Sequence, residues 1–308
     1  MIDFQNVSFS YGEESSGGGI RNVNLTINTG EFVLLTGESG CGKTTITRLV
    51  NGLVPHYYEG NLEGDVLLDG KSVSDTPLYD LAAMVGSVFQ NPKSQFFNVD
   101  TDSELAFACE NLGYPQEDIL KRIDRTVSDY HIKDLMGRSV FALSGGEKQK
   151  IACASSSVLL PGIMVLDEPS SNLDMAAIDD LRQVLSLWKK QGKTILIAEH
   201  RLYYLHDLAD RVLYVKDGEI EREYTPAEFD SLSDGTRKEM GLRPFSLSKL
   251  KPANQYQAHT AKQMEFQNFC FAYKKREPES LHIPSAELPV GETIAIIGLN
   301  GAGKSTLA

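Results

Sequence analysis

The stretch Gly37-Glu-Ser-Gly-Cys-Gly-Lys43-Thr44 decides the fold of this 308-residue chain. It fits the glycine-spaced phosphate-binding loop, in which backbone N–H groups and a helix N-terminus surround phosphate oxygens and the lysine neutralises the outer phosphates. A side chain at Gly40 or Gly42 would block the approach of the backbone to an anion, and the Thr44 hydroxyl is placed to ligate Mg²⁺. The loop predicts a nucleotide-binding core whose contact residues are Gly37, Glu38, Ser39, Gly40, Cys41, Gly42, Lys43, Thr44 and Thr45.

The same loop occurs a second time, as Gly298-Leu-Asn-Gly-Ala-Gly-Lys304-Ser305. The repeat extends beyond the loops, because the segment from Ile2 aligns without gaps on that from Met264, and the segment from Gly30 aligns on that from Gly291. The offsets of 262 and 261 residues indicate that a whole domain of about that length was duplicated. The second loop adds the nucleotide-binding candidates Gly298, Gly301, Gly303, Lys304, Ser305 and Thr306.

The composition is that of an acidic globular chain. Its net charge of −12 argues against nucleic acid as a partner, since phosphate backbones need a basic surface, and against direct adsorption to anionic lipid. The four cysteines lie far apart and indicate neither a disulfide framework nor a zinc site. The start has no basic stretch followed by an apolar one, and the longest apolar region is interrupted by Pro161-Gly162. We expect a chain of the reducing cytosol without a membrane span.

Short apolar runs alternate with helical patterns along the chain. Residues 3–9 alternate apolar and polar side chains as a half-exposed strand, with residues 22–27 as its partner. Buried parallel strands are expected at 32–35, 163–166 and 194–198, helices at 43–52 and 174–191, and a helix-rich insertion at 102–130. We predict an α/β fold: a phosphate-loop NTPase core with a mostly parallel sheet, an N-terminal antiparallel β subdomain and a helical insertion.

A second motif, Leu143-Ser144-Gly145-Gly146-Glu147, precedes a predicted helix. Taken alone it is a capping box, in which Ser144 and Glu147 satisfy N–H groups at the helix start. Its two glycines also leave backbone N–H groups open to an anion. The structural and the binding interpretation can hold together.

The third motif, Val165-Leu166-Asp167-Glu168-Pro169, begins eighteen residues after Glu147 and ends a buried strand. It lies at the carboxyl edge of the predicted sheet, where such folds place ligands. There Asp167 would hold Mg²⁺, while Glu168 would orient and deprotonate an attacking water. An acidic turn in solvent is the plainer alternative, and the phosphate loop argues against it because that loop needs a metal partner.

With these motifs, residues 2 to about 225 resemble the ATP-binding cassette (ABC) ATPases. The resemblance implies hydrolysis of ATP with Mg²⁺ by two domains paired head to tail, each covering the other's ATP with its signature. That signature is Ser144, Gly145, Gly146 and Glu147 here. The resemblance also assigns Gln90 to Mg²⁺ and the lytic water, and His200 to the γ-phosphate. It assigns Tyr11, repeated as Tyr273, to stacking on adenine. Without it these would be a surface glutamine, an incidental histidine and packing tyrosines.

The segment from Gln90 to Gly113 looks like the ATPases of energy-coupling factor importers, whose second glutamine stands here as Gln95. Those importers take up vitamins or metal ions. The resemblance implies a membrane-embedded scaffold subunit, a substrate-capture subunit and a place on the cytoplasmic face of the plasma membrane. Residues 95–97 would line the groove for a scaffold helix, or form a plain amphipathic turn. Two departures are small: Glu147 stands for the commoner Gln and Lys150 for the usual Arg.

Two other functions stay open. A soluble tandem ABC ATPase acting in translation would also lack membrane segments, but it would carry a basic helical linker for RNA, which residues 226–262 are not. A nucleotide sensor without hydrolysis is disfavoured by the presence of both Glu168 and His200.

We divide the chain into a complete nucleotide-binding domain (1–225), a loosely ordered linker (226–262) and the opening fragment of a second domain (263–308). The fragment has a phosphate loop but no Asp-Glu strand and no signature. We therefore expect a C-terminally truncated tandem pair with an incompletely stabilised second part. The first domain would have to pair with the first domain of another molecule, and we expect the ATPase activity of the chain to be weak.

Residues 171–174 match the loop by which paired domains sense each other, although Asp174 is equally a helix N-cap.

Overall fold

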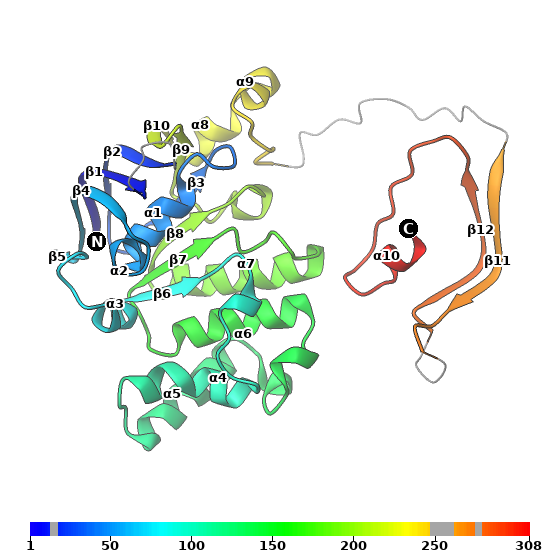
Figure 1. The fold of residues 1–308 in the computed structure, drawn as a ribbon, viewed down its shortest axis with the longest axis horizontal. Coiled ribbons are helices and arrows are strands. Elements are labelled where there is room, and N and C mark those ends of the chain that lie inside the picture. The colour runs from blue at the N-terminus through cyan, green and yellow to red at the C-terminus, as the bar shows by residue number, and fades with distance from the viewer. Residues whose placement is uncertain (13–17, 247–261, 275–278) are drawn as a thin grey trace.

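The computed structural model describes residues 1–12, 18–246, 262–274 and 279–308 (Figure 1). Its N-terminal part is a four-stranded antiparallel sheet in the order β2-β1-β4-β5. The strands are β1 (Ile2–Tyr11), β2 (Gly19–Ile27), β4 (Gly60–Leu68) and β5 (Lys71–Ser72). The alternation read from residues 3–9 is confirmed, because Phe4, Val7 and Phe9 are buried while their neighbours are less so.

The central sheet has six strands in the order β10-β9-β3-β8-β7-β6. They are β3 (Phe32–Thr36), β6 (Val85–Val88), β7 (Ile163–Asp167), β8 (Thr194–Ala198), β9 (Arg211–Lys216) and β10 (Glu219–Tyr224). All neighbours are parallel except β9 and β10. Every residue of β3 and β8 is buried, which is why these strands read as short apolar runs. The predicted, mostly parallel α/β core is confirmed.

Two apolar cores lie on opposite faces of this sheet, because successive residues of a strand point to opposite sides. Phe32 and Leu34 belong to the core with α6 (Gly145–Ser157) and α7 (Met175–Lys190), where Trp188 is fully buried. Val33 and Leu35 belong to the core shared with α1 (Lys43–Val50) and the antiparallel sheet.

The predicted helical insertion is confirmed as α4 (Thr101–Asn111) and α5 (Gln116–Asp129), which pack beside α6 (Figure 1). The shorter helical elements of the first part are α2 (Leu53–His56), α3 (Leu78–Met84), η1 (Pro92–Ser94), η2 (Lys133–Leu135), η3 (Val140–Ala142) and η4 (Tyr203–Leu205). Within the described ranges of the chain, no helix combines the length and the apolarity that a bilayer crossing requires.

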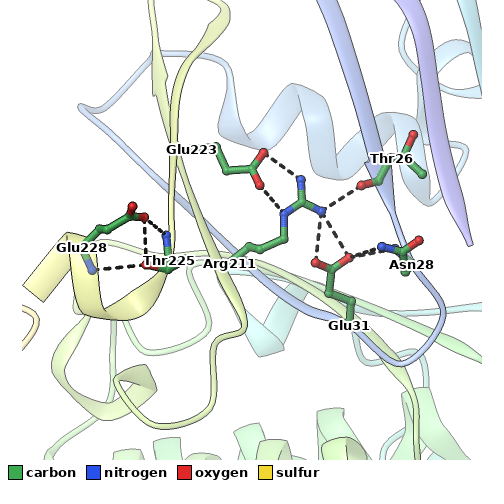
Figure 2. Close-up of polar contacts among 7 residues, drawn as sticks. All are labelled: Thr26, Asn28, Glu31, Arg211, Glu223, Thr225 and Glu228. Atoms are coloured by element: carbon green, nitrogen blue, oxygen red, sulfur yellow. Dashed lines mark hydrogen bonds and ion pairs between the residues drawn. The ribbon is translucent and has the colours of Figure 1, made fainter.

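Arg211, the first residue of β9, ties the two sheets together (Figure 2). Its guanidinium donates two hydrogen bonds, of 2.7 and 2.8 Å, to the carboxylate of Glu223 on β10, a bidentate pairing stronger than a single neutral hydrogen bond. Its Nη1 also donates to the Thr26 carbonyl of β2 at 2.9 Å and to the Glu31 carboxylate at 3.1 Å. Glu31 in turn accepts the Asn28 N–H at 2.8 Å. One guanidinium thus joins strand ends of both sheets.

Residues 226–246 depart from the expected loosely ordered linker. They form α8 (Pro226–Asp230) and α9 (Asp234–Glu239), and Phe229 and Phe245 are fully buried in the first core with ring centroids 5.2 Å apart. A capping box of Thr225 and Glu228 starts α8. For this stretch the expectation is wrong, because two buried aromatics anchor helices too short to show periodicity. Residues 247–261 of the predicted linker lie outside the described residues.

The second part of the chain is an antiparallel hairpin of β11 (Gln263–Phe271) and β12 (Leu281–Pro289), followed by α10 (Lys304–Leu307). Its large apolar side chains stay exposed, among them Phe269, Phe271 and Ile297. Residues 293–297, which align with β3, form no strand. The described residues of this part enclose no core of their own. That it is incompletely stabilised in solution stays a prediction.

Candidate nucleotide-binding and catalytic site

The first phosphate loop connects β3 to α1. Gly37 has φ of 151°, and a Cβ there would lie 2.1 Å from the Val215 carbonyl oxygen, so only glycine fits. Gly42, with φ of 110°, is the N-cap of α1. The Lys43 ammonium donates to the carbonyl oxygens of Gly37 at 3.0 Å and Glu38 at 2.8 Å, inside the curve of the loop. A buried cation at a helix N-terminus with free N–H groups is a site for phosphate.

The other loop candidates surround that cation. Ser39 and Gly40 are exposed at the tip of the loop, and Gly40 adopts φ of 81°. Cys41 is buried, with its Sγ 3.7 Å from Lys43 Nζ. Thr45 lies under Tyr11, whose hydroxyl is 3.2 Å from its Oγ1.

Tyr11 ends β1 beside the loop. Arg48 Nη1 donates to its hydroxyl at 3.0 Å, and the rings of Phe9 and Tyr58 meet it edge-on at centroid distances of 4.8 and 6.2 Å. These protein contacts by themselves hold the Tyr11 side chain beside the loop. Stacking on adenine stays a prediction.

Thr44 and Asp167 meet at the point where Mg²⁺ is expected. The Thr44 hydroxyl donates to Asp167 Oδ1 at 3.2 Å. Burial raises the pKa of Asp167 and the neighbouring Glu168 raises it further, while the Thr44 hydrogen bond lowers it. A hydroxyl and carboxylate oxygens form the hard donor set that Mg²⁺ prefers, and a cation would offset the cost of the buried charge. The residues therefore fit the ion.

Three candidate catalytic side chains converge at the carboxyl ends of β6, β7 and β8. Gln90 Nε2 donates to Glu168 Oε2 at 2.9 Å, and His200 Nε2 lies 3.1 Å from Glu168 Oε1. Glu168 itself adopts φ of 44°, a conformation unfavourable for a residue with a side chain, and its N–H donates to the Ala198 carbonyl at 2.8 Å. The strained backbone points the carboxylate between the amide and the imidazole.

The His200 ring faces this site. Its Nε2 is buried and lies 3.1 Å from the Glu168 carboxylate, and within the described part of the chain it has no hydrogen-bond partner. Burial lowers the pKa of His200, and the Lys43 charge lowers it further against the opposing effect of Glu168 and Glu199. The lowered pKa favours the neutral imidazole, and in the tautomer that carries its proton on Nε2 this nitrogen would donate to a phosphate oxygen. A cleft of about 480 Å³ opens beside Arg48, Gln90 and Asp167.

The signature segment starts α6 as a complete capping box. The Glu147 N–H donates to Ser144 Oγ at 3.3 Å, and Glu147 Oε2 accepts the Ser144 N–H at 2.7 Å. That N–H, followed by the Ser144 hydroxyl and the Arg138 guanidinium, holds the pKa of Glu147 low despite its partial burial. Gly145 and Gly146 occupy the first turn. The structural half of the sequence interpretation is confirmed.

The second phosphate loop repeats the local geometry of the first. Lys304 Nζ donates to the carbonyl oxygens of Gly298 at 2.9 Å and Leu299 at 2.7 Å. The Tyr273 hydroxyl lies 3.1 Å from Thr306 Oγ1, as Tyr11 does from Thr45. Further predicted members of this loop lie around them, namely Gly301 with φ of 80°, Gly303 with φ of 84° as N-cap of α10, and Ser305, which is exposed.

This second loop lies against the first unit's signature side. The Asn300 N–H donates to Asp174 Oδ2 at 2.9 Å, and its side-chain amide donates to the Asn172 carbonyl at 3.2 Å. A Cβ on Gly145 would lie 4.0 Å from Asn300 Nδ2. Asp174 Oδ1 meanwhile caps α7 by accepting the Ala177 N–H at 3.0 Å. Asp174 thus serves as helix cap and as contact between the units, and Asn300 was not predicted.

Glu199 is a site residue that sequence reasoning missed. It is 1% exposed, and its carboxylate accepts the N–H groups of Ser170 and His200 at 3.2 and 2.7 Å and the Tyr204 hydroxyl at 2.8 Å. It therefore fixes the turn that carries His200 to the turn that follows Glu168. Its only signal in the sequence is its place, as a carboxylate between a buried strand and a candidate histidine.

Gln95 has a larger structural role than the sequence indicated. Its side-chain oxygen accepts the Phe89 N–H at 3.2 Å, while its amide donates to the Ser87 and Ala152 carbonyls at 3.2 Å each and to Ser156 Oγ at 2.9 Å. It joins the end of β6 to α6. A partly buried amide that bridges elements in this way cannot be recognised from the spacing of residues along the sequence.

Comparisons with known proteins agree with this geometry. The family model described as "ABC transporter" matches residues 20–171. A "Putative ABC transporter ATP-binding protein" of Treponema denticola is 44% identical across the whole of this chain, which spans 64% of that relative's length. A protein of the same description from Pyrococcus abyssi is 40% identical over 74% of this chain and 81% of its own length.

Solved structures give a matching result. The structure of cbiO1 from Clostridium perfringens, described as part of the ABC transporter complex cbiONQ, superposes with a TM-score of 0.66 at 26% identity. The superposition covers 77% of this chain and 93% of that protein. The chain spans less than two-thirds of the length of the Treponema denticola relative, so the longer protein has regions that this chain does not match.

Proposed function

Since the chain belongs to the family of ABC transporter ATP-binding proteins, we propose that it binds ATP with Mg²⁺ and hydrolyses it to drive a membrane importer. The observation that carries this proposal is the convergence of Gln90, Glu168 and His200 beside the loop that holds Lys43. Phosphate binding alone needs the loop, whereas hydrolysis also needs a base, a water-orienting group and a donor to the transferred phosphoryl group.

Each group then has a role set by its place. Lys43 and the loop N–H groups hold the β- and γ-phosphates, and Thr44, Asp167 and Gln90 would hold Mg²⁺, which neutralises charge on the phosphates when bound. Glu168 accepts the proton of the attacking water, which Gln90 orients. The His200 N–H donates to the γ-phosphate as negative charge develops there.

The replacement Glu168→Gln tests hydrolysis directly. An amide keeps the size and the contact with Gln90 but cannot accept the water's proton, so we expect ATP affinity to stay and turnover to fall by about 100-fold or more. Nucleotide binding by calorimetry and phosphate release measure the two effects. Lys43→Ala is the matched control and should lose binding. Undiminished hydrolysis by the Glu168 variant would remove this residue from its role.

The proposed active form is a head-to-tail pair of nucleotide-binding units. The contacts of Asn300 with Asp174 and Asn172 support it, because they bring a phosphate loop to the signature side of another unit. Each composite site would combine one unit's loop with the other unit's residues Ser144–Glu147. A polypeptide with two units that each carry a loop and a signature would supply the whole pair.

We further assign the importer to the energy-coupling factor type, for vitamins or metal ions. An apolar groove of about 310 Å³, lined by Leu78, Phe97 and Phe107, supports a docked helix of a membrane-embedded scaffold. Phe97 stacks on Phe107 at a centroid distance of 4.9 Å but is still 76% exposed, so the pair leaves apolar surface that a partner could cover. The chain would sit on the cytoplasmic face of the plasma membrane, and a separate capture subunit would recognise the cargo.

Replacement of Phe97 by Ser separates this assignment from a role in translation. We expect ATP binding to persist and association with membranes of co-expressed scaffold to weaken by about tenfold, since exposed aromatics at a groove centre act as anchors. Leu120→Ser, on the exposed side of α5, is the control and should leave association unchanged. Sedimentation with ribosomes instead of membranes would favour the alternative, a soluble tandem ATPase.

A further inference from the structure

The hairpin of the second unit brings together three side chains that bind transition metals. Cys270 on β11 and His282 on β12 are direct partners in the antiparallel register, so their side chains share one face. Glu279 precedes β12 and joins them. We propose that Cys270, Glu279 and His282 form a binding site for Zn²⁺ or a similar borderline divalent cation. The site lies outside the nucleotide machinery and does not rest on the proposed function.

The distances suit such an ion. Cys270 Sγ lies 3.0 Å from His282 Nδ1, which lies 3.1 Å from Glu279 Oε2, and the three ligand atoms are all within 4.8 Å of one another. Zn²⁺ bonds of about 2.0–2.3 Å in a tetrahedron place ligand atoms about 3.3–3.8 Å apart. Side-chain rotations that move these ligand atoms by about an ångström therefore bring them to tetrahedral zinc geometry. The exposed fourth position is open to water.

The convergence of lone pairs also suits a cation. His282 Nδ1 faces a sulfur and a carboxylate oxygen at the same time, and the Cys270 thiol also bonds to Glu279, so three groups with ligand lone pairs converge on one point. A metal ion satisfies the lone pairs of all three atoms together. Cys270 binds it as the thiolate, and its proton passes to solvent.

The first copy shows that the fold does not require these residues. In the sequence alignment of the two copies, Ser8 and Arg21 stand at the places of Cys270 and His282, although the first hairpin has a register shift between Val7 and Phe9 that the second lacks. There Ser8 Oγ accepts the Asn22 N–H at 2.9 Å and Arg21 donates to the Asp217 carbonyl at 2.7 Å. The corresponding strands of the first copy thus pair without a thiol or an imidazole at these places.

The site would stabilise an otherwise weakly supported hairpin. A cation bridging Cys270 and His282 links β11 to β12 directly, and its binding free energy adds to the stability of the strand pair. This ligand set contains a thiolate and an imidazole, which suit borderline cations. It differs in this from the oxygen ligands of Thr44 and Asp167, which suit Mg²⁺. The two sites would select different metals.

Titration of the 308-residue chain with Zn²⁺ in excess Mg²⁺ tests the site. We expect one Zn²⁺ bound by the wild-type chain, and at least tenfold weaker binding by the double variant Cys270→Ser, His282→Arg. Those substitutions install the residues that the first copy carries, so they suit the hairpin. ATP binding at the first loop is the folding control. Equal Zn²⁺ affinity of the double variant and the wild-type chain would overturn the proposal.

Alkylation of Cys270 gives an independent readout. This thiol is exposed, whereas Cys41, Cys109 and Cys153 are buried, so a mild alkylating reagent modifies Cys270 first. We expect Zn²⁺ but not Mg²⁺ to slow the modification, and His282→Arg to remove most of that protection. An alkylation rate that Zn²⁺ leaves unchanged would show that the thiol binds no metal.

Discussion

His200 shows how a single residue's surroundings set its chemistry. The imidazole is placed by Glu199 behind it and faces Glu168 and Lys43 in front. Burial and the lysine charge lower its pKa, which keeps it uncharged where the phosphates of a nucleotide bring negative charge. In the role proposed for His200, a neutral donor would bind the γ-phosphate through one hydrogen bond without a proton exchange during the reaction.

The lowered pKa of His200 predicts a pH dependence of stability. Above about pH 6.5 the imidazole is neutral in both the folded and the unfolded chain. Below that pH the unfolded chain takes a proton that the folded protein resists, so the free energy of unfolding falls as pH falls toward the folded pKa. We expect His200→Gln to lose less stability than the wild-type chain between about pH 7 and pH 5 in chemical denaturation. Parallel losses in both chains would contradict this.

The meeting of the candidate site residues could largely be predicted from the sequence, whereas the residues that hold them in place could not. Glu168 and Asp167 end a buried strand, and Lys43 and Thr44 end a glycine loop, so motif and strand order place them together. Glu199, Gln95 and the contacts of Asn300 depend on which carbonyls and amides meet in three dimensions. Spacing along the chain carries no signal for such pairings.

Among the elements, α8 and α9 change the extent of the first domain. The sequence pattern ended it at residue 225, yet Phe229 and Phe245 lie fully buried beyond that point. The His206 ring contacts Phe245 at a centroid distance of 5.0 Å, so the segment packs on the turn region after β8. Buried parallel strands reveal themselves as apolar runs, whereas helices of five and six residues show no readable period.

Replacement of Phe245 by Ala measures whether this segment belongs to the folded domain. Removing a fully buried ring leaves a cavity, so we expect a loss of about 3–5 kcal/mol in the free energy of unfolding. Lys238→Ala on exposed α9 is the control and should change stability by less than about 0.5 kcal/mol. A stability equal to the wild-type value would mean that residues 226–246 are a loose linker after all.

At the scale of the whole molecule, the two units are unequal. The first has the phosphate loop, the candidate metal ligands and base and the signature segment, whereas the described second unit has a loop and a hairpin with exposed apolar faces. Asn300 brings the second loop to the signature side of the first unit. The loop that holds Lys43 then has no facing signature among the described residues of the same chain.

This inequality predicts that the 308-residue chain hydrolyses ATP weakly and only through encounters between molecules. We expect specific activity to rise with protein concentration, since a second copy must supply the signature that faces Lys43. A mixture of Lys43→Ala and Ser144→Arg chains should regain activity that neither has alone, because each supplies what the other lacks. High activity in dilute single chains, or a mixture as inactive as its parts, would rule out this pairing.

Gln95 has a mechanical consequence for such an assembly. Its side chain holds the end of β6, which leads to Gln90, and also holds α6, which begins with the signature. Two residues further on, Phe97 stands open to a partner. In the proposed assembly, a force applied at Phe97 would reach both the end of β6, which leads to Gln90, and the helix α6, because Gln95 is hydrogen-bonded to both. If the chain drives an importer as proposed, this one side-chain amide would link the scaffold contact to the candidate catalytic glutamine.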